Sequence, residues 1–253
     1  MSKLAGHHAV ITGGGTGIGA AIAKTFSEAG AIVSVMGRRL DVLQEIENAY
    51  PLCAAIPIDV TDEHSVAAAM VSARTRAPVT ILVNNAGGAE TAPLAKTSTD
   101  LWNRMIALNL TGTFLCSRAL LPEIAAAPGG RIISIASTSG LKGYAYTGAY
   151  AAAKHGVIGL TRTMALELAK TSATANAICP GFADTDLVQR SLDAVQAKTG
   201  LTRADALAQF VRDNPQRRLI EPDEVAACAL WLCDPLSASV NGQSIAIAGG
   251  EVM

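Results

Sequence analysis

The sequence places a tyrosine and a lysine where they could act together on a proton. Tyr150 and Lys154 are four residues apart, so they share one face if the segment is helical. Three alanines at 151–153 favour a helix, and apolar residues recur at helical spacing further along. Ser137 stands thirteen residues before Tyr150, at the end of an apolar run typical of a buried strand. These three side chains are therefore candidates for one catalytic site.

A neighbouring ammonium would allow a phenol to donate or accept a proton near neutral pH. A free tyrosine has a pKa near ~10. A fixed positive charge ~4 Å away is worth up to ~4 kcal/mol at an effective dielectric constant of ~20, enough to lower that pKa by as much as ~3 units. Tyr150 would then be the general acid or base, and Ser137 would hydrogen-bond the substrate oxygen. Taken alone, a Tyr-x-x-x-Lys pair also fits a solvated helix surface. The choice between a catalytic and a surface pair therefore depends on the elements around it.

A glycine-rich loop lies between the first predicted strand and the first predicted helix. It reads Thr12-Gly13-Gly14-Gly15-Thr16-Gly17-Ile18-Gly19. Glycines allow a tight turn and a close approach of the backbone to a pyrophosphate, and the helix N-terminus offers free N–H groups to that anion. A flexible turn is the alternative in isolation, but the position between strand and helix favours a dinucleotide site.

The end of the second predicted strand bears on the choice of cofactor. A carboxylate that binds the ribose 2′-hydroxyl is expected about 20 residues past the glycine loop. Here that place holds Met36-Gly37-Arg38-Arg39. A guanidinium suits a 2′-phosphate through charge-assisted hydrogen bonds, so Arg38 and Arg39 favour NADP(H) over NAD(H). The alternative is a solvated start of the next helix.

The pattern of apolar segments predicts how these residues are positioned. Seven apolar runs read as strands, and helix-period segments fill most gaps between them. The strands are predicted at His8–Thr12, Ala31–Met36, Cys53–Ile58, Thr80–Asn84, Arg131–Ala136, Ala175–Cys179 and Ser244–Ala248, and the helices at about 17–29, 39–49, 62–76, 98–126, 149–170 and 222–233. Apolar runs that do not alternate with polar residues are expected of parallel strands covered by helices on both faces. The prediction is a single α/β domain over 1–253, with a Rossmann-like, doubly wound, parallel seven-stranded sheet flanked by helices on both faces.

One connection is longer than the rest. Residues 181–220 lie between the last two predicted strands, and a segment of about 183–213 is expected to be a substrate lid of one or two short helices. Candidate pocket walls are Ser139, Tyr144, Tyr146, Phe182, Leu187 and Val188. Cations gather around the lid, namely Arg190, Lys198, Arg203, Arg212, Arg217 and Arg218. They would meet a CoA or carrier-protein phosphate, or else form a solvated helix face.

Composition and charge narrow the class of protein further. The 253 residues carry a formal net charge of −1, with no overall basic field for nucleic acid. No apolar run reaches 18 residues, and the N-terminus lacks the apolar core of a signal peptide, so we expect a cytoplasmic protein without a membrane span. The five cysteines form no Cys-x-x-Cys pair and are expected to be core thiols, and no metal site is predicted.

Together these motifs resemble the short-chain dehydrogenase/reductase family over nearly the whole chain. They are the glycine loop, Asn84-Asn85-Ala86-Gly87, Asn109, Ser137, Tyr150-x-x-x-Lys154 and Pro180-Gly181. The segments around Ser137, Lys154 and Cys179 are similar to the 3-oxoacyl and aromatic-polyketide ketoreductase branch. The resemblance implies hydride transfer between a nicotinamide and a carbonyl or carbinol carbon, without metal.

The resemblance also implies residue roles. Asn109, Ser137, Tyr150 and Lys154 would be catalytic, with Asn109 placing a water that links Lys154 to solvent. The cofactor would contact Gly13, Gly15, Thr16, Gly17, Ile18, Gly19, Arg38, Arg39, Asp59, Val60, Asn85, Ala86, Gly87, Tyr150, Lys154, Pro180, Gly181 and Thr185. Asn84 would stabilise the sheet beside the cofactor. Family members are commonly homotetramers, with helices 98–126 and 149–170 pairing at one interface.

Three functions remain open. The first is an NADPH-linked reductase of a 3-oxoacyl thioester or a polyketide-like ketone, carried as a CoA or carrier-protein thioester. The second is a dehydrogenase that oxidises a small or cyclic secondary alcohol or a hydroxyacyl-CoA, with NAD a further option. The third is a dinucleotide sensor without catalysis, which would not need the set of Asn109, Ser137, Tyr150 and Lys154.

Overall fold

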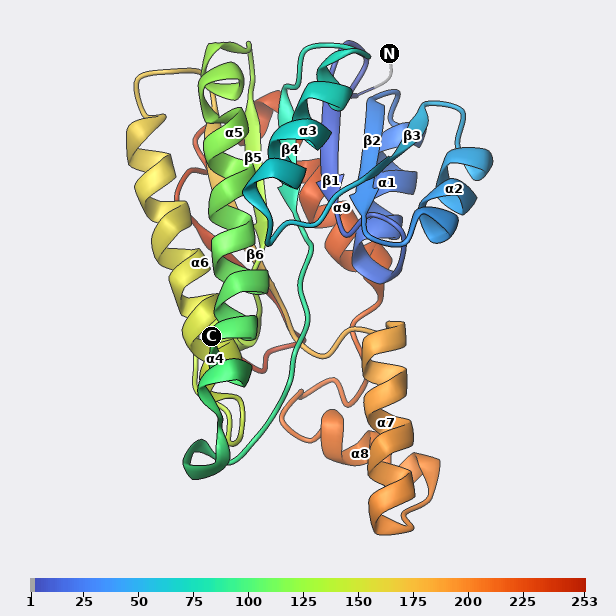
Figure 1. Cartoon of the computed structure of the whole chain (residues 1–253). Helices are drawn as coiled ribbons and strands as arrows, with labels where there is room; N and C mark the ends of the chain where they lie inside the picture. Colours follow the sequence, from blue (N-terminus) through green and yellow to red (C-terminus); the bar gives the residue numbers. More distant parts are fainter. Residues whose placement is uncertain (1–2) are drawn as a thin grey trace.

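The computed structural model describes residues 3–253, except the side chains of Leu187 and Ala194. Its strands form one parallel sheet in the order β3-β2-β1-β4-β5-β6-β7 (Figure 1). Their bounds are β1 His8–Thr12, β2 Ile32–Gly37, β3 Cys53–Pro57, β4 Ile81–Asn84, β5 Arg131–Ile135, β6 Thr174–Pro180 and β7 Ser244–Ile247. The predicted doubly wound sheet is confirmed. Strand order reverses between β1 and β4, where such sheets bind ligands.

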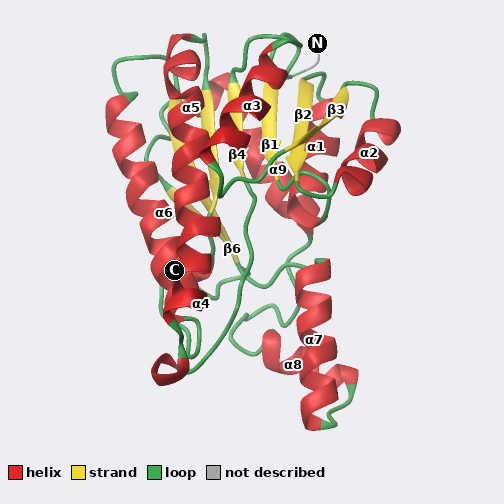
Figure 2. Cartoon of the chain, in the orientation of Figure 1, coloured by secondary structure: helices red, strands yellow, loops and turns green. Residues whose placement is uncertain are grey.

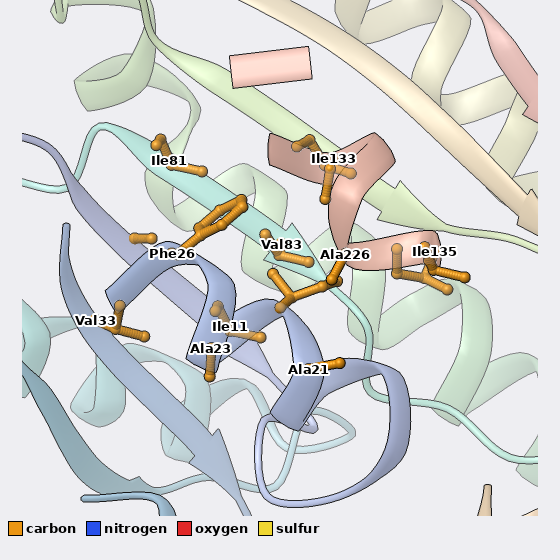
Figure 3. Packing of buried hydrophobic residues seen from close by; sticks show 14 of the residues in the cluster. Ile11, Ala21, Ala23, Phe26, Val33, Ile81, Val83, Ile133, Ile135 and Ala226 are labelled. Atoms are coloured by element: carbon orange, nitrogen blue, oxygen red, sulfur yellow. The ribbon is translucent and has the colours of Figure 1, made fainter. Parts of the chain in front are cut away.

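Helices cover both faces of this sheet (Figure 2). They are α1 Gly17–Glu28, α2 Leu40–Ala49, α3 Glu63–Arg74, α4 Thr99–Ile106, α5 Gly112–Ala126, α6 Gly148–Glu167, α7 Asp186–Thr199, α8 Arg203–Phe210 and α9 Pro222–Cys233. The strand residues Ile11 and Val83 pack with α1 and α9 on one face, as Figure 3 shows. Their neighbours Val10 and Leu82 pack with α3, α5 and α6 on the other. Burial on both faces explains why the strands lack alternation.

The predicted helix 98–126 contains a break that the sequence pattern did not indicate. Between α4 and α5 lies a π-helical turn, Ala107–Thr111, with Asn109 in it. Such turns often occur at functional sites. The stretch Thr99–Ala126 is long and apolar enough to cross a membrane by length and composition alone. In this fold, however, its α5 part buries Leu115, Leu120 and Ile124 against the sheet, as a core helix does.

The long connection after β6 forms a separate helical pair. Helices α7 and α8 project beyond the edge where the strands end (Figure 1). They share a small apolar cluster of their own, with Val188, Leu192 and Ala206 buried in it. The end of the connection returns to the sheet through a bridge between Ala183 and Ile220. We refer to residues 183–220 as the α7–α8 insertion.

All five cysteines are free thiols, as the sequence predicted. Four are buried, and Cys228 is half-buried.

Candidate active site

The sheet order brings the predicted site residues to one edge. The carboxyl ends of β1, β4, β5 and β6 are neighbours because these strands pair directly in parallel. The glycine loop follows β1, Asn85 to Gly87 follow β4, Ser137 lies two residues after β5, and Gly181 follows β6. Ligands of open α/β sheets bind at this edge.

The glycine loop is tied to the loop after β4. The Thr12 hydroxyl accepts hydrogen bonds from the Asn85 and Ala86 backbone N–H groups, at 3.0 and 3.1 Å. The Asn85 amide donates to the carbonyls of Thr12 and Gly13, at 3.1 and 2.9 Å. A Cβ on Gly13 would lie 2.9 Å from the Ala86 Cα, and the φ of Gly13 is +64°. The position therefore requires glycine for both space and backbone conformation.

The N-terminus of α1 fits a pyrophosphate. The helix begins at Gly17 without a side-chain cap from Thr16, and its first turn carries no acidic residue. Its first N–H groups and its dipole therefore attract an anion. Thr185, from the loop after β6, lies against Gly17, since a Cβ there would be 2.8 Å from the Thr185 Cγ2. The loop residues Gly13, Gly15, Thr16, Gly17, Ile18 and Gly19 are thus grouped as a dinucleotide site requires.

The candidate adenosine end lies where β2 and β3 finish. Arg38 and Arg39 follow β2 directly, and both are exposed. Neither makes an ion pair with a residue the structure describes. Hydrogen bonds from Thr61, at 2.7 and 2.9 Å, lower the pKa of Asp59, with a smaller contribution from the Arg38 charge. Val60 packs its side chain beside Gly112 in the core, so only its backbone is available to border an adenine.

Lys154 is a buried lysine at the centre of the site. Its Nζ donates to the Ile135 carbonyl at 2.8 Å and lies 5.6 Å from the centre of the Tyr150 ring. Only 5% of the residue is exposed. Burial lowers the pKa of Lys154 to about 8, partly offset by Cys179. The four-residue spacing on α6 therefore places the Lys154 ammonium over the Tyr150 ring.

Tyr150 and Ser137 are hydrogen-bonded to each other. The Ser137 Oγ also accepts from the Ser139 N–H at 3.0 Å, which fixes the serine. Burial raises the pKa of Tyr150, and the Ser137 hydrogen bond only partly offsets this. The lowering by Lys154 that the sequence suggested is not seen, because burial has the largest effect on the pKa of Tyr150 and raises it.

Asn109 holds the π-helical turn against the loop after β4. Its side-chain oxygen accepts from the Gly88 N–H at 3.1 Å, and its amide donates to the carbonyls of Gly88 at 2.9 Å and Met105 at 3.0 Å. A Cβ on Gly87 would lie 2.8 Å from that side-chain oxygen and 3.7 Å from the Lys154 Nζ. The structure thus places Asn109 beside the lysine. Its side chain positions the loop, and the role of holding a water stays a prediction.

The predicted nicotinamide residues lie at the end of β6. Pro180 closes the strand, and Gly181 donates to the Ile247 carbonyl at 3.0 Å. A Cβ on Gly181 would be 3.1 Å from the Glu251 Oε2. This brings the C-terminal tail to the site.

The predicted pocket walls divide into two groups. Ser139 and Tyr144 lie in the segment after β5, and the Tyr144 hydroxyl donates to Glu251. Tyr146 is 63% exposed, with φ +70°. Phe182 packs edge-on against Phe210 at 5.1 Å between ring centres, and Val188 is buried within the α7–α8 insertion. These two therefore support the insertion, and the side chain of Leu187 lies outside the described residues.

Most of the predicted lid cations have partners. Arg218 bonds to Glu224 at 2.6 and 2.7 Å, Arg203 pairs with Asp193 at 2.5 Å, and Arg212 lies 3.3 Å from Asp213. Arg217 donates to the Arg212 carbonyl at 2.6 Å. Arg190 and Lys198 make no ion pair within the described part of the chain. The charge available for a substrate phosphate is therefore much smaller than the sequence suggests.

Sequence reasoning missed Glu251 and Lys142. The Lys142 Nζ lies 3.4 Å from the Glu251 Oε1. Neither belongs to a periodic pattern or a motif. Only the tertiary fold brings the chain end to the loop after β5.

Comparison with known proteins agrees with this geometry. Residues 7–196 match the family described as short chain dehydrogenase. The chain belongs to this family of oxidoreductases, which act on alcohol or ketone groups.

Two relatives and one solved structure illustrate the range of similar proteins. Cis-4-hydroxycyclohexanecarboxylate dehydrogenase of Sinomonas cyclohexanicum is 38% identical over 247 residues, covering 96% of this chain and 95% of that protein. D-beta-hydroxybutyrate dehydrogenase of Rhizobium meliloti is 34% identical over 252 residues, covering 96% and 97%. A crystal structure of an actinorhodin polyketide ketoreductase variant with NADPH superposes with a TM-score of 0.91 at 31% identity, covering 97% of each chain.

Proposed function

We propose that the protein is an NADP(H)-dependent ketoreductase that interconverts a ketone and a secondary alcohol, with a 3-oxoacyl thioester or a polyketide-like ketone as substrate. The observation that carries the proposal is Tyr150, which contacts Ser137 and has the buried Lys154 ammonium over its ring, 5.6 Å from the ring centre. Similarity to a ketoreductase with NADPH supports the choice of substrate and cofactor.

The chain's own residues account for the proton transfer. When bound, the dinucleotide supplies or accepts a hydride at its nicotinamide ring. Ser137 hydrogen-bonds the substrate oxygen, and the Tyr150 hydroxyl gives that oxygen a proton in reduction and takes it back in oxidation. Lys154 stabilises the phenolate that reduction leaves, and Asn109 lies beside it for proton exchange with solvent. Thr185 and Gly181 would border the nicotinamide.

The exposed guanidinium groups of Arg38 and Arg39 support the preference for NADP(H). They directly follow β2 and occupy the positions at which a carboxylate would be expected to bind a ribose 2′-hydroxyl. A 2′-phosphate would pair with them through charge-assisted hydrogen bonds.

A dehydrogenase of a small or cyclic secondary alcohol is the second candidate. Relatives named for hydroxybutyrate and hydroxycyclohexanecarboxylate favour it. A sensor without catalysis would leave the paired Ser137, Tyr150 and Lys154 without a purpose.

Three further features complete the proposal. The α7–α8 insertion would act as the substrate lid, because it projects over the edge that carries the site (Figure 1).

Exposed apolar groups on α5 and α6, such as the 41%-exposed Phe114, support a homotetramer that pairs these helices. The five free thiols fit a reducing compartment such as the cytoplasm.

Replacement of Tyr150 with phenylalanine tests the catalytic assignment. Tyr150→Phe keeps the ring but removes the transferred proton, so kcat should fall about 10²–10⁴-fold while the Kd for NADPH changes little. Reduction of 3-oxoacyl thioesters and ketones with NADPH, and oxidation of secondary alcohols with NADP⁺, give the rates by stopped-flow or steady-state absorbance, and fluorescence titration gives the Kd. Tyr50→Phe, at the far end of α2, is the matched control and should keep wild-type rates. Unchanged turnover in Tyr150→Phe would falsify the assignment.

A further inference from the structure

The C-terminal tail forms part of the wall around the site. Gly249 and Gly250 have φ of +59° and +91°, which turns the chain after β7. Gly249 packs on Asn214, and a Cβ on Gly250 would lie 3.2 Å from the Pro215 Cγ. The tail is therefore held between the sheet edge and the end of the α7–α8 insertion.

Glu251 carries a buried carboxylate in this tail. Its side chain is only 3% exposed. The Tyr144 hydroxyl donates to its Oε1, and the Lys142 Nζ lies 3.4 Å from the same oxygen. The Lys142 Nζ also reaches the Glu251 backbone carbonyl at 3.4 Å and lies 4.7 Å from the centre of the Tyr144 ring. We call these three residues the Lys142–Tyr144–Glu251 cluster.

The cluster lies next to the reacting groups. Thr138, the neighbour of Ser137, hydrogen-bonds the Tyr144 hydroxyl. On the other side, the Glu251 Oε2 faces Gly181, where a Cβ would lie 3.1 Å away. The cluster thus spans from the segment after β5, which carries Ser137, to the loop after β6, which carries Gly181.

Charges within the cluster cancel. One ammonium and one carboxylate sum to zero, and the single phenolic proton of Tyr144 points to Glu251 rather than to a substrate. Burial, together with Glu251, raises the pKa of Tyr144, so the phenol stays neutral. Asp213, the other carboxylate whose charge reaches Tyr144, has Arg212 beside it. This wall therefore offers no uncompensated positive charge to an anion that must give up its water.

We propose that Glu251 determines specificity by neutralising Lys142, so that the pocket prefers an uncharged ketone over a free carboxylate of the same skeleton. This inference rests on the proposed function and sharpens it. A 3-oxoacyl group carried as a thioester or ester satisfies the preference, whereas a free oxo acid or hydroxy acid does not. It therefore separates the ketoreductase proposal from the part of the second candidate that acts on free hydroxy acids.

A matched pair of substrates tests the inference. Methyl acetoacetate and acetoacetate share a skeleton and differ in charge. Wild type should give the higher kcat/KM with the ester. Glu251→Gln keeps the shape and an acceptor for Tyr144 but leaves the Lys142 charge uncompensated. The ratio of kcat/KM for acetoacetate to that for the ester should rise about tenfold, the scale of one unit charge a few ångströms away.

Two companion variants separate charge from structure. Glu251→Asp should keep the wild-type ratio. Lys142→Met combined with Glu251→Gln should return the ratio to the wild-type value, because the uncompensated cation is gone. An equal loss with both substrates in Glu251→Gln, or a wild-type preference for acetoacetate, would overturn the inference.

Failure of the proposed function gives a different result. If wild type oxidised NADPH with neither substrate nor any ketone of the panel, the proposed function would fall before this test applies. If wild type reduces the ester, Tyr150→Phe does not, and Glu251→Gln leaves the ratio unchanged, only the specificity role of Glu251 is wrong.

Discussion

The catalytic edge of the sheet and the α7–α8 insertion above it are stabilised in different ways. At the edge, Lys154 and Asn109 are buried and make hydrogen bonds to backbone groups. The insertion has a small apolar cluster and exposed ion pairs such as Arg203 with Asp193. Exposed pairs contribute at most ~1 kcal/mol each, whereas buried polar groups are costly to disturb.

This difference assigns different tasks to the two regions. The edge is preformed by the sheet, so cofactor and proton-transfer groups keep their geometry without substrate. The insertion has only a small apolar cluster and exposed ion pairs, so the proposed lid role predicts that it opens at a smaller free-energy cost than the edge. Glu251 lies between the two regions, since its tail packs on Asn214 and Pro215 and its carboxylate faces Gly181.

The largest expected effect concerns the stability of the edge as a function of pH. The pKa of Lys154 is lowered to about 8 by burial, against about 10.4 when unfolded. Near pH 7 both states are protonated, and the folded state bears the cost of a buried charge. Lys154→Met should therefore be more stable than wild type at pH 7, by up to ~3 kcal/mol, although it cannot support catalysis. Urea unfolding of the cofactor-free proteins measures this difference.

The sign of the pH dependence follows from proton counting. Between pH 8 and about 10.4 the unfolded state binds more protons than the folded state, so wild-type stability rises with pH relative to Lys154→Met. The advantage of the variant should shrink across this window. A constant difference from pH 7 to 10, or a less stable variant at pH 7, would show that the lysine is not strained by burial.

A smaller effect is expected at the cofactor end of the edge. Arg38→Ala should lower kcat/KM with NADPH about thirtyfold, about 2 kcal/mol, because charge-assisted hydrogen bonds to the 2′-phosphate are lost. The value with NADH should stay within about twofold. Steady-state kinetics with both cofactors give the comparison, and Lys24→Ala, on the outer face of α1, is the control. Equal losses with NADPH and NADH would contradict phosphate recognition.

The smallest effect is expected in the insertion. Arg203→Ala removes exposed contacts to Asp193, Gln189 and Gln196. Global stability should change by less than ~1 kcal/mol, while amide exchange in α7 and α8 should become faster than in α6. Hydrogen-exchange mass spectrometry resolves the two regions. Uniform slowing or acceleration of exchange throughout the chain would mean that the insertion is not an independent unit.

Sequence alone predicted the catalytic edge of the sheet far better than the C-terminal tail and the Lys142–Tyr144–Glu251 cluster beside it. Strand bounds agree within two residues, because doubly buried parallel strands leave unbroken apolar runs. Tyr150 and Lys154 are recognisable because a four-residue spacing on a helix fixes their common face.

The features that sequence missed all depend on tertiary contact. The π-helical turn at Asn109 leaves no mark on the apolar pattern. Glu251 acquires its environment only where the chain end meets Lys142 and Tyr144. The pKa of Tyr150 depends on a balance between burial and charge, which spacing alone does not give.

Isotope transfer tests the central claim most directly. Wild type is incubated with a ketone and NADPH carrying deuterium at the transferred position of nicotinamide C4, and the alcohol is analysed by mass spectrometry and NMR. One deuterium should appear on the carbinol carbon, and product formation should collapse in Tyr150→Phe. A product whose carbinol hydrogen comes from solvent, or one formed equally well without the phenol, would contradict hydride transfer with Tyr150 as the proton donor.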